Sequence, residues 1–429
     1  MNNTTPSITT SDFLTKIHDS NCQFVDIRDS NTYNGWRLHD EPRSGHIPGA
    51  ISFPYSWLQY LDWPEILEGK KLDPEKEVII YGSNPDEIAN VSEQFSRVGF
   101  VNINWYNKFT DEWLTDPSNP LDSLHRFRQL VPASWLKQLL DTGKADEYSN
   151  NKFVLCHAHY QNREAYDRGH IPCAIELDTN RLESEKTWNR RSSEEIRNTL
   201  LEHGITSDTT VILYGRFDYP TMDNPFPGSS AGHLGAMRCA FLLLYAGVTD
   251  VRILNGGLRA WEDNGYPIST EETIKQAVPD FGVAIPQNPR LAVDTPEAKV
   301  ILAQTDANLV SVRSWREFIG EVSGYHYIEP KGRIPGAVFG NCGTDAYHME
   351  NYRNPDHTTL AYPEIARQWA DVGITADTFN AFYCGTGWRG SEAFINAWLM
   401  GWPRIAVYDG GWYEWSGDPN NPIETGIPE

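Results

Sequence analysis

Basic side chains are scarce in this chain. It has 36 lysines and arginines against 58 aspartates and glutamates, which gives a formal net charge of -22 at pH 7. A molecule this acidic repels polyanions, so we expect no nucleic acid and no anionic membrane among its partners. A small anionic substrate stays compatible with the sequence, because a local group of cations can reverse the potential over a short distance.

Long apolar runs are missing as well. No stretch approaches the roughly 18 apolar residues that a membrane-spanning helix needs. The amino terminus, MNNTTPSITTSDFL, has neither the basic nor the apolar region of a signal peptide. We therefore predict a cytoplasmic protein from the chain as given, and a periplasmic one if a leader has been removed.

Cysteine is rare and irregularly spaced. The chain has six cysteines and no C-x-x-C pair, as expected of reduced thiols rather than of disulfides or a zinc site. The fragments C-H-A-H at 156–159 and H-M-E at 348–350 resemble pieces of metal sites. Adjacent side chains of a strand point to opposite faces, however, and no complementary pair follows. We predict no metal and no cofactor.

What the chain does contain is a repeat. RSGHIPGAISF at 43–53 returns as DRGHIPCAIEL at 167–177 and as PKGRIPGAVFG at 330–340. Downstream of each copy lies a strand-like run that ends in tyrosine: EVIIY, TVILY and FNAFY. The residues that follow these tyrosines are Gly82, Gly215 and Cys384. A third block, clearest in ILNGGLRAW and VYDGGWYEW, closes the copies.

The repeat predicts three tandem α/β domains. Strand-like runs alternate with helical patterns, and this alternation in short units is typical of a mainly parallel sheet with helices on both faces. A chain of 429 residues also exceeds one ordinary core. We place the domains at 1–125, 126–279 and 280–429, the second join lying in the proline-containing QAVPDFGVAIPQNPR.

The stretch YCGTGWRGS carries the chemistry. Gly385 and Gly387 can adopt positive φ, so that backbone N–H groups point into the loop, and the helix expected behind them adds its N-terminal donors and dipole. This setting favours a thiolate on Cys384, and Arg389 adds a permanent cation. The simpler alternative is a buried structural thiol in a strand-to-helix turn; the glycines and the arginine favour a nucleophile.

The G-x-I-P-G-A block, the C-x-x-G-x-R loop and the closing Y-D-G-G-W-Y-E-W segment resemble the rhodanese (sulfurtransferase) family, and three copies with one cysteine resemble its three-domain thiosulfate sulfurtransferases. The resemblance covers nearly the whole chain. It implies the rhodanese fold, a persulfide on Cys384 and two catalytically silent domains, with Gly82 and Gly215 at the nucleophile's position. The second domain departs from the pattern, because residues 217–237 replace a tight loop, either as a lid or as a surface loop.

The loop and the resemblance together predict the reaction. The Cys384 thiolate attacks the outer sulfur of thiosulfate or a similar small anionic donor, and cyanide, a thiol or a protein acceptor then takes that sulfur from the persulfide. We expect Arg389 to be catalytic with Cys384. The rest of the loop is predicted to bind substrate: Gly385, Thr386, Gly387 and Trp388. Arg313 and Arg333 are further candidates for donor binding, with a surface cation or a structural ion pair as the alternative for each.

Other functions stay open at this point. A cysteine phosphatase of the same fold needs one more residue, C-x5-R, to encircle a phosphate, so the shorter loop argues against it. A persulfide carrier charged by a partner desulfurase would use the same loop, and turnover with free thiosulfate separates the two. The C-G-T-G opening also resembles mercaptopyruvate sulfurtransferases. Cys342 is more typical of an inert loop thiol than of a resolving cysteine.

Overall fold

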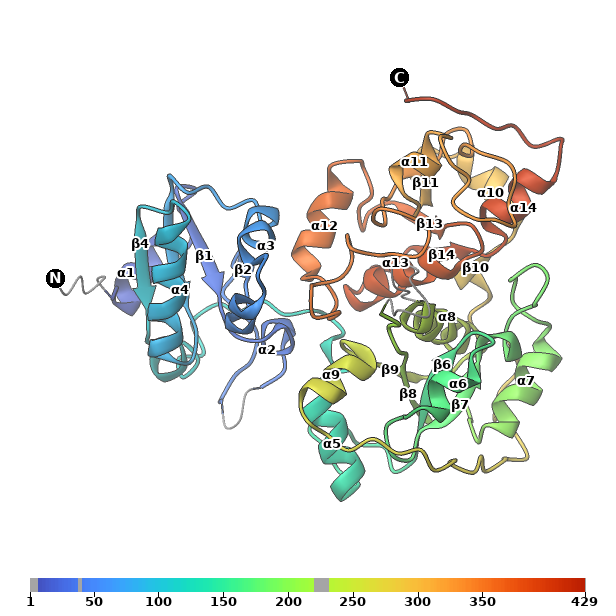
Figure 1. The fold of residues 1–429 in the computed structure, drawn as a ribbon, viewed down its shortest axis with the longest axis horizontal. Helices are drawn as coiled ribbons and strands as arrows, with labels where there is room; N and C mark the ends of the chain where they lie inside the picture. The colour runs from blue at the N-terminus through green and yellow to red at the C-terminus, as the bar shows by residue number, and fades with distance from the viewer. Residues whose placement is uncertain (1–6, 38–40, 220–230, 429) are drawn as a thin grey trace. The chain divides into compact units, whose positions relative to one another are not determined.

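The computed structural model describes residues 7–37, 41–219 and 231–428. The chain divides into two compact units, Met1–Phe127 and Arg128–Glu429. The first unit holds one sheet and the second holds two, and the strand pairs that build them are parallel. Helices flank each sheet (Figure 1). The predicted fold class is confirmed, and the exact joins between the domains remain a prediction.

The sheet of the first unit has the strand order β2-β1-β3-β4. Its strands are Ile51–Ser52 (β2), Cys22–Asp26 (β1), Glu77–Tyr81 (β3) and Ile103–Tyr106 (β4). Its helices are Thr10–Lys16 (α1), Ser30–Asn34 (α2), Trp63–Gly69 (α3) and Pro85–Arg97 (α4). Successive strand residues face opposite sides, so Phe24 packs in one core cluster while Val25 packs in the other.

The second unit contains two five-stranded sheets, in the orders β5-β9-β8-β6-β7 and β10-β14-β13-β11-β12. The strands of the first of these are Leu130–Val131 (β5), Asp250–Leu254 (β9), Thr210–Tyr214 (β8), Phe153–His159 (β6) and Ile175–Asp178 (β7). Those of the other are Ala292–Val293 (β10), Ile405–Tyr408 (β14), Phe379–Tyr383 (β13), Ala307–Ser311 (β11) and Val338–Phe339 (β12).

The helices of the second unit connect these strands. Those of the second domain are Ala133–Thr142 (α5), Arg163–Asp167 (α6), Ser193–Glu202 (α7), Ala231–Ala246 (α8) and Gly257–Asp263 (α9). Those of the third are Thr295–Leu302 (α10), Trp315–Phe318 (α11), Tyr362–Ala370 (α12), Trp388–Leu399 (α13) and Gly411–Gly417 (α14). Single turns lie at Tyr55–Gln59, Phe109–Trp113, Phe127–Gln129, Thr179–Arg181 and Pro289–Leu291.

The repeated sequence blocks have a structural reason. In the first two domains the tyrosine that ends an inner strand accepts a hydrogen bond from the backbone N–H of the isoleucine in G-x-I-P: Tyr81 from Ile47 and Tyr214 from Ile171. This bond ties one block to the other at the carboxyl end of the sheet, where parallel α/β folds place their sites. In the third domain the buried Tyr383 lies at the same place beside Ile334, but its hydroxyl makes no hydrogen bond with the residues that the structure describes.

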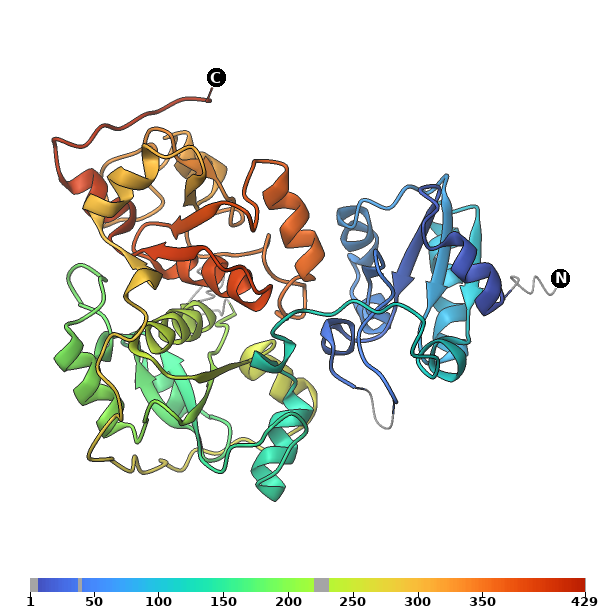
Figure 2. The same cartoon turned by 180° about the vertical axis from the view of Figure 1, so that it is seen from behind.

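Two helices lie side by side between the sheets of the second unit, α8 and α13 (Figures 1 and 2). Every residue of α8 from His233 to Ala246 is buried, as expected of an apolar helix enclosed on all sides. The rings of Phe241 on α8 and Phe394 on α13 meet at 5.3 Å. Because α13 begins at the cysteine loop, this packing sets the second domain directly against the loop.

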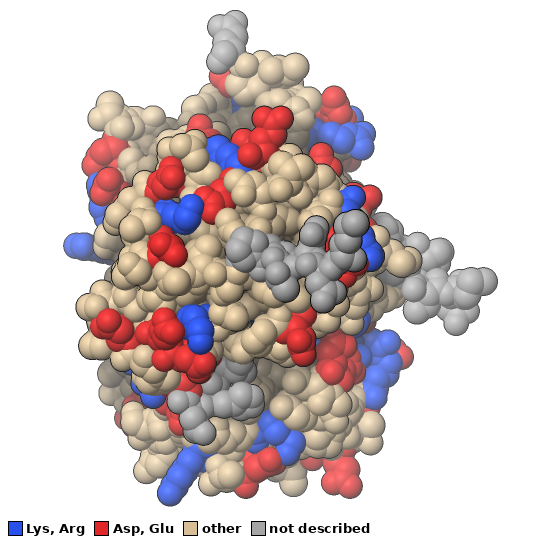
Figure 3. Space-filling model, turned by 90° about the vertical axis from the view of Figure 1, so that its left-hand side faces the viewer, with Lys and Arg blue, Asp and Glu red and all other residues tan. Residues whose placement is uncertain are grey.

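The charged surface is mixed in sign. On the face shown in Figure 3, acidic and basic side chains are interspersed over a largely uncharged surface. Across the described ranges, no helix is both long enough and apolar enough to cross a bilayer.

Candidate active site

The cysteine loop joins a strand to a helix. Cys384 follows β13 directly, and Gly387, with a φ of +85°, is the N-cap of α13. The Cys384 carbonyl accepts a hydrogen bond from the backbone N–H of Trp412 at 2.8 Å. The Gly385 carbonyl accepts one from Tyr413 at 2.9 Å. α14 therefore fixes the loop from one side, while the first N–H groups of α13 face it from the other.

A tyrosine lies over the loop. A β-carbon on Gly385 would be 2.7 Å from the hydroxyl oxygen of Tyr325 and closer still to its ring, so this close approach requires glycine. Cys384 itself is 0% exposed. The thiol thus lies below the surface, beside a phenol that the sequence did not single out.

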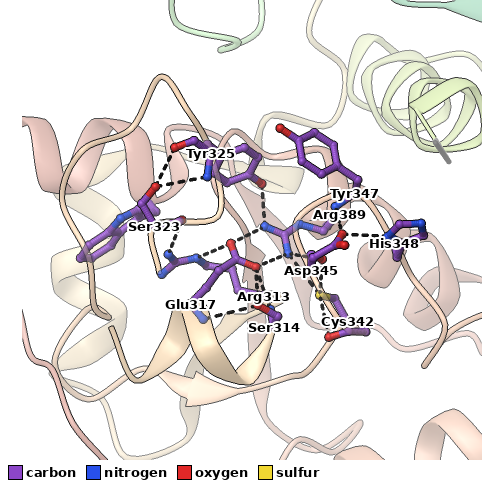
Figure 4. A network of polar contacts seen from close by, with 12 residues as sticks. Arg313, Ser314, Glu317, Ser323, Tyr325, Cys342, Asp345, Tyr347, His348 and Arg389 are labelled. Carbon is purple, nitrogen blue, oxygen red and sulfur yellow. Dashed lines mark hydrogen bonds and ion pairs between the residues drawn. The ribbon is translucent and has the colours of Figure 1, made fainter. Parts of the chain in front are cut away.

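Arg389 organises the residues around the loop (Figure 4). It is 1% exposed, and its Nη1 and Nη2 donate to the two carboxylate oxygens of Glu317, each at 2.9 Å. Nη2 also donates to the Tyr325 hydroxyl at 2.6 Å, and Nη1 to Cys342 Sγ at 3.1 Å. The guanidinium predicted to act in catalysis therefore holds a carboxylate and a phenol in place, and its catalytic part stays a prediction.

Glu317 also accepts a hydrogen bond from Arg313. The Arg313 Nε donates to it at 3.3 Å, and Nη1 donates to the Gly332 carbonyl at 2.7 Å. Burial would raise the pKa of Glu317, but Arg389 and Arg313 outweigh it and lower the pKa to about 2. Two arginines against one carboxylate leave a net positive charge, which favours an anion on the adjacent loop.

Arg333 occupies a position that recurs in the repeat. The residues at this place form isolated antiparallel bridges in all three domains, as His46, His170 and Arg333. The Arg333 side chain pairs with Glu424 at 3.3 Å and donates to the Gly426 carbonyl at 2.5 Å. In the structure it is a structural ion pair, as Arg313 is, and donor binding by either residue remains a prediction.

A cavity of about 220 Å³ opens beside the loop. Six aromatic side chains line it: Tyr160, Trp188, Tyr325, Tyr327, Tyr347 and Trp388. The first two come from the second domain, and Thr386 and Arg389 of the loop complete part of the wall. The Thr386 hydroxyl lies beside that of Tyr327. Trp188 stacks on Tyr327 with ring centroids 4.6 Å apart, so the two domains meet at this wall.

The structure brings most of the predicted loop residues to this site. Thr386, Trp388 and Arg389 line the cavity, and Gly385 and Gly387 shape the backbone around it. Sequence reasoning does not find the tyrosines. Its available signal was the aromatic run GYHYIEP (324–330) before the third G-x-I-P block, which the silent copies lack. Tyr160 and Trp188 carried no signal, because they lie far away along the chain.

In the first two domains a glycine stands at the position that Cys384 occupies in the third. A β-carbon on Gly215 would lie 1.9 Å from the Gly232 carbonyl oxygen, and one on Gly82 would lie 2.7 Å from the Ile27 side chain. In the second domain, the backbone at Gly232 therefore fills the space where a side chain at position 215 would lie. Of the predicted insertion at 217–237, residues 220–230 lie outside the described residues, and the end of it forms the first turns of α8.

The other cysteine and histidine motifs show no metal geometry. Within the ranges described, no group of three or more His, Cys, Asp or Glu side chains is placed to hold an ion. In C-H-A-H, His159 pairs with Glu176 at 2.9 Å and His157 is buried. Burial raises the pKa of the Cys342 thiol to about 12, which keeps that thiol protonated near neutral pH.

The family model of the rhodanese-like domain matches three segments of the chain, residues 9–116, 132–264 and 294–418. Together they make up most of its length. The chain belongs to the rhodanese family. The thiosulfate sulfurtransferase YnjE of Escherichia coli (strain K12) is 40% identical over 417 residues, covering 96% of this rhodanese and 91% of that protein. The sulfur carrier protein TtuD of Thermus thermophilus is 28% identical, covering 69% of this chain and 96% of its own length.

Solved structures of EanB are similar to this rhodanese over its whole length. Wild-type EanB superimposes with a TM-score of 0.95 at 51% identity, covering 99% of this chain and 98% of the other. Further EanB structures contain hercynine, or ergothioneine with a cysteine persulfide in a tetrahedral intermediate state. Family and relatives make this chain a rhodanese-type sulfurtransferase that works through a cysteine persulfide.

Proposed function

We propose that Cys384 carries the persulfide and delivers its outer sulfur to a small betaine acceptor of the hercynine type, bound in the aromatic cavity. The cavity is the observation that carries this proposal. Hercynine is a trimethylated histidine, and a quaternary ammonium is attracted to the faces of aromatic rings when several surround it. The six aromatic side chains that line the cavity beside the cysteine loop supply such ring faces.

The EanB variants support the same assignment. The tyrosine, the threonine and the second cysteine replaced in those structures stand at the same spacing from the persulfide cysteine as Tyr325, Thr386 and Cys342 stand from Cys384. A further cysteine replaced in that set corresponds by spacing to Ser311. The replaced tyrosine, threonine and second cysteine therefore recur here, whereas the further thiol does not.

The chemistry balances in two steps. The Cys384 thiolate attacks the outer sulfur of a sulfane donor, an S–S bond forms, and the rest of the donor leaves with the electron pair, as sulfite does from thiosulfate. The ring carbon between the imidazole nitrogens then attacks the outer sulfur. A C–S bond forms, the S–S bond breaks, and Cys384 leaves as thiolate, which takes up the proton that the ring carbon loses. Arg389 donates to the Tyr325 hydroxyl, which leaves the phenol proton for a hydrogen bond that we expect with the acceptor ring.

Burial of the thiol favours a small acceptor over a partner protein. Cys384 is 0% exposed, so another protein's cysteine has no direct path to its sulfur, whereas a small molecule fits the adjoining cavity. This argues against the carrier reading that the similarity to TtuD keeps open. The donor stays thiosulfate or a similar sulfane compound. Because Arg389 is paired with Glu317, its charge alone does not decide between inorganic and organic anionic donors, and mercaptopyruvate and thiosulfate should be compared directly.

Mass spectrometry tests the proposal. Incubation with a sulfane donor should add about 32 Da to the protein. Hercynine should then remove that mass and appear as ergothioneine. Cys384→Ser should abolish both, while Cys173→Ser, which removes an exposed thiol, should leave both intact. Sulfur transfer by Cys384→Ser at the wild-type rate would refute the assignment of the nucleophile.

A further inference from the structure

The second domain reaches the cavity through one loop. Glu183 and Arg190 form an antiparallel bridge, and between them Trp188 has a φ of +56°. Bulky residues rarely adopt this left-handed conformation, and it persists only where the surrounding structure imposes it. The strained residue presents its indole to the cavity, where it stacks on Tyr327 and donates its ring N–H to the Tyr160 hydroxyl at 3.2 Å.

Two buried side chains of the second domain hold both tryptophans of the cavity. The Glu183 carboxylate oxygens accept the indole N–H of Trp388 at 2.9 and 3.0 Å. Arg238 donates through Nε to Glu183 at 2.9 Å and through Nη2 to the Trp188 carbonyl at 2.7 Å. Glu183 and Arg238 are both 0% exposed, so water does not compete for these bonds.

The third domain anchors this pair. Arg238 Nη2 donates to Asp409 Oδ1 at 2.6 Å, and Asp409 Oδ2 accepts the backbone N–H of Arg190 at 2.8 Å. The remaining Nη1 of Arg238 has no hydrogen-bond partner and lies 3.1 Å from the β-carbon position of Gly387. Glycine in the cysteine loop thus leaves room for a guanidinium from the neighbouring domain.

We propose that the buried pair Glu183 and Arg238 consists of positioning residues: it fixes the two tryptophans as opposing parts of the acceptor site, so that the cysteine-free second domain selects which acceptor takes sulfur from the third. This inference rests on the proposed function. A quaternary ammonium acceptor is held by the tryptophan faces. Cyanide is small enough to reach the persulfide without them. The second domain supplies selectivity, and the third supplies the sulfur.

Steady-state kinetics with hercynine and with cyanide test the role of the pair. In Glu183→Gln, the amide cannot accept from both Trp388 and Arg238 without turning an N–H toward one of them. We expect the KM for hercynine to rise about five- to tenfold. The rates of persulfide formation and of thiocyanate formation should stay within about twofold of wild type. The matched control is Glu176→Gln, which removes a partly buried carboxylate of the same domain that does not contact the tryptophans. Its KM for hercynine should equal that of wild type.

A second variant tests the same hydrogen bond while leaving the buried Glu183–Arg238 ion pair, and so the stability of the fold, intact. Trp388→Phe keeps an aromatic ring and the Glu183–Arg238 pair but removes the indole N–H together with part of the ring face, so it should also raise the KM for hercynine. The double variant should have the same KM for hercynine as Glu183→Gln alone, because both substitutions break the same hydrogen bond between Trp388 and Glu183. Equal losses with hercynine and cyanide, or an unchanged KM for hercynine in Trp388→Phe, would overturn the proposal.

The wild type separates this inference from the proposed function. A wild-type protein that forms thiocyanate but no ergothioneine would reject the acceptor class and leave the persulfide chemistry standing. The same variants are then compared with glutathione, a bulky thiol, against cyanide. A selective loss with glutathione upholds the positioning role, and an equal loss with both acceptors rejects it.

Discussion

At the scale of single residues, one carboxylate organises the active site. Glu317 is 0% exposed and accepts from both Arg313 and Arg389, and Arg389 in turn holds Tyr325. Buried ion pairs gain little over apolar packing, but the loss of one partner leaves charges unbalanced in a medium of low polarity. Glu317 therefore balances the charge of both arginines at the site, although it lies outside the cysteine loop.

We expect Glu317→Gln to destabilise the protein by about 3–5 kcal/mol, because two buried arginines lose their shared carboxylate. Denaturant unfolding followed by circular dichroism measures this free energy. The exposed pair of Glu321 with Arg316 offers the control, and Glu321→Gln should cost less than about 1 kcal/mol. Equal effects of the two substitutions would contradict the role assigned to Glu317.

The same carboxylate predicts how stability responds to acid. The pKa of Glu317 falls from its ordinary value of 4.5 to about 2 in the folded protein, so the unfolded chain binds its proton first. Its contribution to stability is present above about pH 4.5 and is lost as the pH falls toward about 2. Unfolding free energies measured across this range should fall less steeply in Glu317→Gln than in wild type. Parallel curves would count against the shift.

At the scale of elements, a strand, a loop and a helix recur three times with different contents. In the third domain the loop between β13 and α13 accommodates the buried side chain of Cys384. In the second domain, β8 runs toward Gly215, and the backbone at Gly232 fills the space where a side chain would begin. The second domain therefore lacks both a thiol at this position and the space for one.

Gly215→Cys should not create a second persulfide site. Its β-carbon would overlap the Gly232 carbonyl, so we expect a loss of stability of about 2 kcal/mol or more and still one added sulfur per chain. Thermal unfolding and intact mass measure the two outcomes. Gly69→Ala, at an exposed position with no atom within 4 Å of the new carbon, should be close to neutral. A second 32 Da increment in Gly215→Cys would refute this account.

At the scale of the whole molecule, the described cavity walls all come from the unit Arg128–Glu429. The second and third domains share a buried core there, in which α8 packs against α13, and charged groups pair across the join. The first domain has its own sheet and core clusters within Met1–Phe127. The cavity is thus built by two domains, one of which has no cysteine at the position of Cys384.

Truncation should separate these contributions. We expect residues 128–429 to fold and to keep both persulfide formation and transfer, because no described wall of the cavity is lost. Residues 280–429 alone should be inactive and poorly folded, since they expose the face of α13 that α8 covers and leave Asp409 without Arg238. Circular dichroism and sulfur transfer measure both fragments. An active third domain by itself would contradict the shared site.

The sequence by itself determined the three-fold repeat, the parallel α/β class and the single cysteine among the three equivalent loop positions, because these depend on patterns within short segments. The tertiary structure alone decided what surrounds that cysteine. Arg389, read from the sequence as a cation for an anionic donor, is paired with Glu317, since a buried guanidinium must find a partner. Trp188 reaches the cavity from the silent second domain through long-range packing, which local patterns do not encode.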